Sequence, residues 1–209
     1  MSTTKIALVD YGAGNLPSVE RALARMGARA ERASSAETLQ GCQALILPGV
    51  GHFGALMRTL GEQRLLEPLR SAIRRGVPFL GICLGLQALY DRSEEDPSHA
   101  GLGILSGTVE PLPSTAKLPH MGWNQVRRVR PSILLRDVPE SSFFYFAHSY
   151  AMLDMGDVAV ALSDHSVPFV AALEHDNVLA VQFHPEKSGE AGAEVLRNFL
   201  AFAGVEGRP

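Results

Sequence analysis

Short, uninterrupted apolar segments constrain the fold of this chain more than any other feature. They cover residues 5–9, 44–47, 79–82 and 178–183. A half-exposed strand alternates apolar and polar residues, whereas unbroken apolar runs of this length are typical of strands buried on both faces. Segments with helical spacing lie between or after these runs, at residues 16–26, 65–75 and 191–202. Strands that alternate with helices predict a parallel sheet covered on both sides.

Extended segments of a second kind follow residue 91. They are shorter and less uniformly apolar, and we expect antiparallel pairing at 107–110, 126–129, 143–150, 158–162 and 169–173. Together with the parallel strands they predict a three-layer α/β fold with a mixed, mostly parallel sheet flanked by helices. No repeat or Pro/Ser-rich linker marks a boundary, so we expect residues 1–209 to form one domain.

Composition narrows the classes of function. The apolar runs are far shorter than the roughly 18 residues of a membrane-spanning helix, which argues against a membrane protein. A pI near 6.2 argues against a general nucleic-acid surface. The basic residues closest to such a patch, better explained as solvated strand ends, are Lys117, Arg127, Arg128 and Arg130. Cys42 and Cys83 form no CxxC motif or Cys/His cluster, which predicts a reducing compartment, the cytoplasm, and no metal or cofactor.

A candidate nucleophile follows the apolar run 79–82. Gly81-Ile82-Cys83-Leu84-Gly85 has the form of a nucleophile elbow with cysteine in the usual serine position. The glycines permit a sharp turn, and a helix beginning near Leu84 would stabilise a thiolate through its free N–H groups and its dipole. A small buried cysteine in a tight turn would give the same pattern, so both interpretations stay open at this point.

His184 has the setting most suggestive of a base among the seven histidines. It ends the last apolar run, and Pro185 cannot donate to a sheet ladder and favours an extended residue before it. In extended geometry Glu186 would share a side with His184 and could orient the imidazole. A hydrogen-bonded strand-end histidine and a solvated carboxylate are the alternative, but they do not account for this spacing beside a separate cysteine elbow.

Backbone donors for an oxyanion are available after another apolar run, in Pro48-Gly49-Val50-Gly51. The N–H groups of Val50 and Gly51, with that of Leu84, are the candidates. Ligands of open parallel sheets bind beyond the carboxyl ends of the strands, where this loop, the elbow and the histidine all fall. A plain glycine-rich turn is the alternative for the loop.

These three segments together resemble the class I glutamine amidotransferases, in which a Cys-His-Glu triad releases ammonia from glutamine. The resemblance implies that Cys83 is the nucleophile, His184 the base and acid, and Glu186 the carboxylate that orients the histidine. The positions that match substrate-binding residues of the family are Gly49, Gln87, Ser149 and Tyr150.

Further segments narrow the resemblance to the glutaminase subunits of imidazole glycerol phosphate synthases. They are Asp10-Tyr11-Gly12-Ala13-Gly14-Asn15, Pro119-His120-Met121-Gly122-Trp123-Asn124, Phe144-Tyr145-Phe146-Ala147-His148-Ser149-Tyr150 and His184-Pro185-Glu186-Lys187-Ser188. The resemblance runs from about residue 5 to residue 202 and is least regular at 164–170. It implies a heterodimer with a (β/α)8-barrel cyclase that uses the ammonia to form imidazole glycerol phosphate and AICAR in histidine biosynthesis, and allosteric control by that partner. Positions matching the subunit interface are Asn15, Trp123 and Lys187.

Apart from the resemblance, these added residues have simpler explanations. Asn15 could cap the helix that follows it, and Trp123 could be buried or anchor a loop. Lys187 could be a solvated charge. His120 and His148 could be structural histidines whose nitrogens are hydrogen-bonded.

Other functions use the same motifs. A cysteine peptidase or γ-glutamyl hydrolase could employ Cys83 and His184 on larger substrates, and a non-catalytic binding protein could retain the fold. The glutaminase subunit of another biosynthetic amidotransferase would share the triad. Glutamine turnover against a peptide panel separates the first two classes, and the copurifying partner identifies the pathway.

Overall fold

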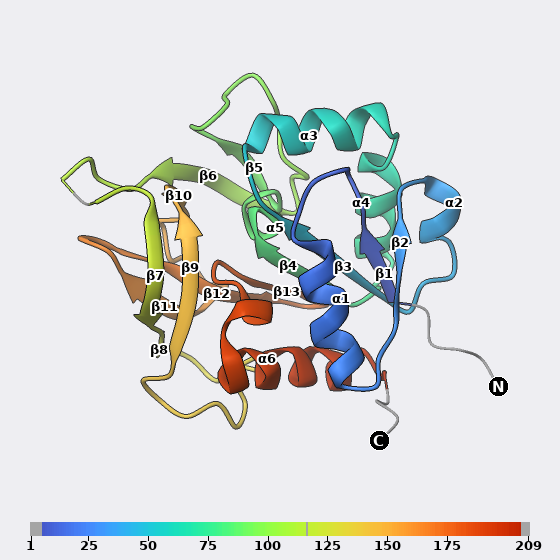
Figure 1. Cartoon of the computed structure of the whole chain (residues 1–209). Helices are drawn as coiled ribbons and strands as arrows, with labels where there is room; N and C mark the ends of the chain where they lie inside the picture. The colour runs from blue at the N-terminus through green and yellow to red at the C-terminus, as the bar shows by residue number, and fades with distance from the viewer. Residues whose placement is uncertain (1–5, 116, 206–209) are drawn as a thin grey trace.

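An eight-stranded mixed sheet forms the centre of the computed structural model, which describes residues 6–115 and 117–205 (Figure 1). Its strand order is β2 (Ala30–Ala33), β1 (Ile6–Val9), β3 (Ala44–Gly49), β4 (Phe79–Cys83), β13 (Val178–Val181), β12 (Pro168–His175), β11 (Ala159–Asp164) and β8 (Arg127–Arg128). The strands from β2 to β13 run parallel, and the pairs from β13 to β8 are antiparallel. The expectation of a mixed, mostly parallel sheet flanked by helices is confirmed; residue 5, included in the first apolar run, lies outside the described residues.

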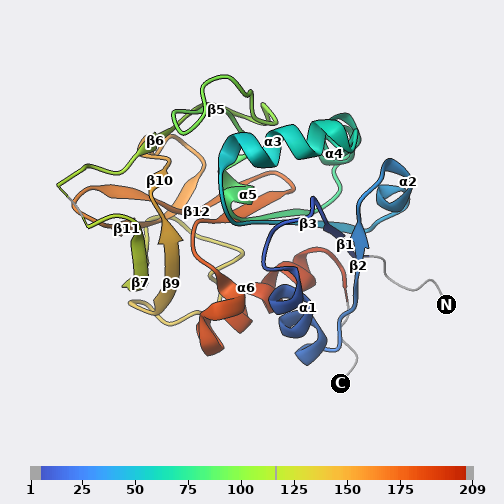
Figure 2. The same cartoon turned by 45° about the horizontal axis from the view of Figure 1, so that its top comes forward.

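Alternating residues of the central strands face two separate apolar clusters. In β1, Ile6 and Leu8 pack into one cluster, and Ala7 and Val9 pack into the other. Helices α1 (Leu16–Arg25) and α6 (Gly189–Phe202) cover the first face, and α3 (Phe53–Glu62) and α4 (Leu66–Arg74) cover the second (Figure 2). Both-face burial is therefore the physical reason for the unbroken apolar runs.

Elements beyond the main sheet were predicted less completely. Two small sheets join β10 (Tyr150–Ala151), β6 (Leu105–Pro111) and β5 (Tyr90–Ser93), and β7 (His120–Gln125) with β9 (Phe143–His148). The expected antiparallel pairing is wrong for one edge of β6, which pairs parallel with β5 and antiparallel with β10. The sequence analysis also missed β2, β5, β7, α3 and the short helix α2 (Ala36–Leu39). None of the helices in the described part of the chain has both the length and the apolar character needed to span a membrane.

Candidate active site

The three segments singled out in the sequence meet at one edge of the main sheet. Strands β3, β4 and β13 are neighbours, and Gly49 at the end of β3 lies opposite Cys83 at the end of β4. His184 follows the end of β13, which pairs with β4 on its other side. The carboxyl ends of these parallel strands therefore bring the elbow, the glycine-rich loop and the histidine together.

Backbone geometry explains the glycines around Cys83. Cys83 has φ +54° and ψ −108°, a conformation that L-residues adopt only under strain. A Cβ on Gly85 would lie 1.9 Å from the Leu47 carbonyl oxygen, and one on Gly81 would lie 2.7 Å from the Gly85 carbonyl oxygen. The elbow is therefore present, but the following helix α5 (Leu84–Gln87) has only one turn. The expected contribution of a helix dipole is correspondingly small.

Two polar contacts surround the sulfur of Cys83, whose side chain is buried. Gln182 Nε2 donates to Cys83 Sγ at 3.4 Å, and Sγ lies 3.9 Å from the Ala147 carbonyl oxygen. Gln182 is fully buried at the end of β13. Gln182 was not among the residues predicted for the site; a lone amide in the otherwise apolar run 178–183, two positions before the candidate base, is the signal that could have identified it.

His184 and Glu186 form a buried pair. His184 Nδ1 lies 2.9 Å from Glu186 Oε1, and the two side chains are 2% and 1% exposed. The contact arises from a 3-10 turn, η1 (Pro185–Lys187), rather than from the extended geometry expected. His184 Nε2 is buried and has no hydrogen-bond partner within the described structure. It is thus free to exchange a proton with a reacting group.

The charges of the site perturb both members of this pair. Burial alone would lower the pKa of His184, but the sulfur of Cys83 and the carboxylate of Glu186 outweigh it and raise that pKa to about 10. Burial alone would raise the pKa of Glu186, but hydrogen bonds from His184 and Asn15 and the imidazolium charge hold it below its ordinary value. The arrangement favours the imidazolium form of His184 beside the ionised carboxylate of Glu186.

Asn15 lies against the triad carboxylate. It occupies the N-cap position of α1, yet its side chain makes no capping bond. Its Nδ2 instead donates to Glu186 Oε1 at 3.1 Å. The capping explanation for Asn15 is therefore wrong, and its side chain binds the same Glu186 oxygen that His184 contacts.

In the glycine-rich loop after β3, one candidate oxyanion donor is hydrogen-bonded to Tyr11. The Val50 N–H donates to the Tyr11 hydroxyl at 3.1 Å, and that hydroxyl donates back to the Val50 carbonyl at 3.4 Å. Tyr11 is buried, and burial raises its pKa to about 12, so the phenol stays protonated. Gly51 adopts φ +99°, which favours glycine at the loop's turn. The Val50 N–H is therefore occupied in this conformation.

A cavity of about 130 Å³ lies beside Cys83. The residues named as candidates in the sequence that line it are Val50, Gly51, Cys83, Leu84, Gln87, His148, Ser149, Tyr150, His184 and Lys187. Gly49 is absent from this lining; it is buried in β3, where a Cβ would lie 2.5 Å from the Leu84 Cβ. The structure thus gives Gly49 a close-packing role beneath the elbow and shows no surface of it facing the cavity.

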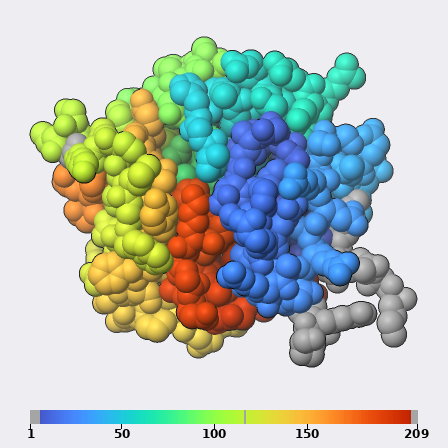
Figure 3. All heavy atoms as spheres, in the orientation of Figure 1, coloured from blue at the N-terminus to red at the C-terminus, as the bar shows by residue number. Residues whose placement is uncertain are grey.

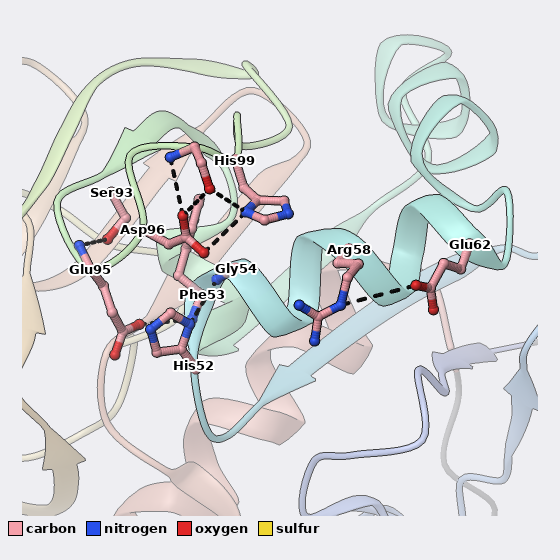
Figure 4. Close-up of polar contacts among 10 residues, drawn as sticks. His52, Phe53, Gly54, Arg58, Glu62, Ser93, Glu95, Asp96 and His99 are labelled. Atoms are coloured by element: carbon pink, nitrogen blue, oxygen red, sulfur yellow. Dashed lines mark hydrogen bonds and ion pairs between the residues drawn. The ribbon is translucent and has the colours of Figure 1, made fainter.

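One lining residue, Glu95, was missed by the sequence analysis. It follows β5, and its Oε2 accepts the Phe53 N–H at 2.7 Å at the start of α3 (Figure 4). His52 Nδ1 accepts the Gly54 N–H there, and the neighbouring Asp96 carboxylate lies 3.0 Å from His99 Nδ1. The signal available in the sequence was a run of carboxylates just after a strand, which alone resembles a solvated turn.

The three interface candidates lie along one exposed surface. Trp123 on β7 is 57% exposed, so it is not a core residue, and its ring meets Tyr145 edge-on at 6.2 Å. Lys187 Nζ lies 5.5 Å from the centre of the same Tyr145 ring. Segments near α1, η1 and β9 lie side by side on the face shown in Figure 3. Trp123 and Lys187 therefore meet at Tyr145, and Asn15 meets Glu186, the residue before Lys187.

The remaining candidates have structural partners. His120 and His148 are buried and hydrogen-bonded, as the simpler explanation expected. Cys42 and Cys83 are buried and form no disulfide. Within residues 6–115 and 117–205, no group of His, Cys, Asp or Glu side chains could hold a metal ion.

Comparison with known proteins agrees with this geometry. The family model for glutamine amidotransferase class-I matches residues 7–202. The imidazole glycerol phosphate synthase subunit HisH of Methanothermobacter thermautotrophicus is 50% identical over 195 residues, which cover 93% of this chain and 97% of that protein. The same subunit of Geobacillus kaustophilus is 44% identical over 205 residues, covering 95% and 97%.

Solved structures share the fold at lower identity. PurLQS from Thermotoga maritima superimposes with a TM-score of 0.76 at 20% identity, covering 96% of this chain and 99% of that one. A structure described as a glutamine amidotransferase gives 0.75 at 21% identity, with the same coverage. These two likenesses concern the fold alone. The family match and the close relatives show that this chain belongs to the class I glutamine amidotransferases and, within them, to the HisH subunits of imidazole glycerol phosphate synthase.

Proposed function

We propose that this chain is the glutaminase subunit of an imidazole glycerol phosphate synthase, hydrolysing glutamine through Cys83, His184 and Glu186. The observation that carries the proposal is the strained, buried Cys83 beside a His184–Glu186 pair at the carboxyl ends of adjacent strands. The identity of 50% to a protein named HisH supports the choice of pathway.

The triad supplies each proton transfer that amide hydrolysis needs. Cys83 Sγ attacks the side-chain carbonyl of glutamine, and the C–N bond breaks as His184 donates its Nε2 proton to the leaving nitrogen, which departs as ammonia. The resulting thioester is attacked by water, whose proton His184 accepts. The C–S bond then breaks and releases glutamate and the Cys83 thiolate. Glu186 holds the imidazole and supports its positive charge.

The cavity wall provides groups for the rest of the substrate. Gln87, Ser149 and Tyr150 lie around the space beside Cys83, and we assign them to binding glutamine. Glu95 adds a carboxylate that could pair with the α-ammonium group. Gly49 contributes through the packing that keeps the elbow in place.

Two backbone N–H groups would stabilise the oxyanion. Leu84 N–H follows the nucleophile directly, and Val50 or Gly51 from the loop after β3 would supply the second donor. Because the Val50 N–H is bonded to Tyr11, the loop must reorient for Val50 to serve. This requirement supports low activity of the isolated chain and activation by a partner.

We assign the partner to a (β/α)8-barrel cyclase that forms a heterodimer with this single 1–209 domain. The exposed surface around Trp123, Asn15 and Lys187 is the proposed contact. Ammonia passing to the barrel would be consumed in forming imidazole glycerol phosphate and AICAR, the lyase step of histidine biosynthesis. The absence of a disulfide between Cys42 and Cys83 supports a reducing compartment, the cytoplasm.

The test compares glutamate release by the chain alone, with the cyclase subunit, and with that subunit plus its nucleotide ligand. We expect a low rate alone and a large rise with partner and ligand together. A glutamine-mimicking alkylator should label Cys83 and spare Cys42. A lone chain at full rate, or no rise with the partner, would contradict this assignment; cleavage of a peptide panel would indicate a peptidase or γ-glutamyl hydrolase.

A further inference from the structure

A series of hydrogen bonds, buried at the His120–His148 contact, runs from the β7–β9 pair to the wall of the cavity. Asn124 Nδ2 lies 3.2 Å from His120 Nε2, and His120 Nδ1 lies 3.0 Å from His148 Nε2. His148 Nδ1 lies 2.9 Å from the Tyr150 carbonyl oxygen. Strands β7 and β9 pair His120 directly opposite His148, which brings the two rings together.

Backbone carbonyls at both ends fix the direction of this chain. Asn124 Nδ2 also donates to the Asp164 carbonyl at 2.8 Å, so it is a donor and His120 Nε2 must accept. His120 Nδ1 then carries the proton and donates to His148 Nε2. At the inner end the Tyr150 carbonyl can only accept, so His148 Nδ1 carries its proton. A single neutral tautomer of each histidine satisfies every bond.

The surroundings keep both histidines neutral. Burial lowers the pKa of His148 to about 3 and that of His120 to about 4. His120 stacks on His165 with ring centres 4.2 Å apart, and His148 packs edge-on against Phe169. An added proton on either ring would place two donors face to face within the chain. The hydrogen-bond direction is therefore maintained at neutral pH.

The inner end of the chain meets the substrate cavity. The Tyr150 carbonyl accepts a second hydrogen bond from Gln87 Nε2 at 2.8 Å, and both residues line the cavity. Gln87 Nε2 also donates to Gln182 Oε1 at 3.1 Å, and Gln182 donates to Cys83 Sγ. The Tyr150 carbonyl oxygen therefore joins His148 to the Gln87 amide. Gln87 in turn contacts Gln182, which donates to Cys83 Sγ.

We propose that His148 and His120 are positioning residues of the glutaminase reaction, which hold the Tyr150 carbonyl and the Gln87 amide where the glutamine side chain binds. The proposal rests on the function proposed above. The bond to the Tyr150 carbonyl requires a proton on His148 Nδ1. The hydrogen bond that His120 donates to His148 Nε2 keeps the proton on Nδ1, so both histidines have a role beyond satisfying each other's hydrogen bonds.

The test measures glutamine KM and kcat in the complex with the cyclase subunit and its nucleotide ligand. His148→Leu removes the donor to Tyr150 and should raise KM roughly tenfold, with kcat changing less than about threefold. His148→Asn places an amide N–H near the position of Nδ1 and should keep KM within about threefold of the parent. His120→Leu should raise KM, and His120→Asn should restore much of the loss.

A matched control comes from the same cluster. His165 stacks on His120, but its Nε2 lies within hydrogen-bond distance of the Lys117 carbonyl oxygen. It takes no part in the hydrogen bonds that run from Asn124 to Tyr150. His165→Phe preserves the stacking and should leave KM unchanged. An unchanged KM in His148→Leu, equal KM values in the Leu and Asn variants, or an equal rise in His165→Phe would overturn the proposal.

Folding is checked by thermal unfolding of each variant. Where the Leu variants do not fold, the comparison moves to His148→Asn and His148→Gln, because only the Asn amide reaches the Nδ1 position. A lower KM for Asn supports the proposal, and equal or reversed values overturn it. A parent complex that does not hydrolyse glutamine overturns the proposed function, and this inference with it.

Discussion

Removing the Tyr11 hydroxyl should raise the activity of the isolated chain. In the structure this hydroxyl accepts the Val50 N–H at 3.1 Å and donates to the Val50 carbonyl at 3.4 Å, which holds the peptide in a conformation unavailable to the oxyanion. Tyr11→Phe keeps the buried ring and deletes only these contacts. Only the molecules whose loop has reoriented are active, so their fraction limits the rate of the isolated chain. Destabilising the resting conformation of the loop raises that fraction and therefore raises kcat.

The magnitude follows from the contacts removed. A neutral hydrogen bond contributes about 1 kcal/mol net, and the second contact at 3.4 Å is weaker. Losing about 1 kcal/mol from the resting conformation should raise kcat of the isolated chain roughly fivefold. KM should stay the same, because the substrate-binding residues are untouched. The rate of the fully activated complex should also stay the same, so the activation ratio should fall roughly fivefold.

Steady-state glutamate release with and without the cyclase and its ligand measures this ratio. Tyr90→Phe is the matched control, since Tyr90 is also a buried phenol but lies in β5 rather than beside the loop after β3. A folded Tyr11→Phe variant with an unchanged or lower kcat in isolation, or with an unchanged activation ratio, would refute the reasoning.

Three further predictions concern the triad and the buried histidines. Cys83→Ala should abolish glutamine hydrolysis without disturbing partner binding, while ammonium salts restore product formation by the complex; residual glutamine use at an appreciable rate would contradict the nucleophile. His184→Asn should lower kcat by orders of magnitude and Glu186→Gln by less, and equal losses in the two kinetic assays would contradict the assigned roles. The pKa of His148 is lowered from 6.5 to about 3, so its contribution to folding is present above pH 6.5 and is lost as pH falls toward 3. The free energy of unfolding, measured with urea across that pH range, should fall less in His148→Asn than in the parent protein. An equal fall in the two proteins would contradict the lowered pKa of His148.

Much of the main sheet could be predicted because burial on both faces leaves a local mark. The apolar runs at β1, β3, β4 and β13 differ from half-exposed strands at every second position, and their short length distinguishes them from helices. Element boundaries agreed closely for α1 and α4, where Gly27 and Gly76 adopt positive φ just beyond the helix ends. The helix α3 was missed because it contains two glycines and follows a glycine-rich loop.

Within the site, the sequence by itself determined the chemical groups and their order along the chain. Cys83 between glycines and the His184-Pro185-Glu186 spacing are local features, and each sits at the end of an apolar run, so their meeting follows from parallel strand order. The need for glycine at position 85, in contrast, comes from tertiary packing, since a Cβ there would lie 1.9 Å from the Leu47 carbonyl oxygen of β3.

Only the tertiary structure decided which groups touch across long separations. Asn15 contacts Glu186 across 171 positions, and Tyr11 holds Val50 across 39. Residue periodicity carries no information on such pairs, because the contacts depend on how loops from different strands converge. The protonated nitrogens of His120 and His148 likewise depend on the carbonyls of Asp164 and Tyr150, which only the packing of β7, β9 and β11 brings to the ends of one hydrogen-bonded chain.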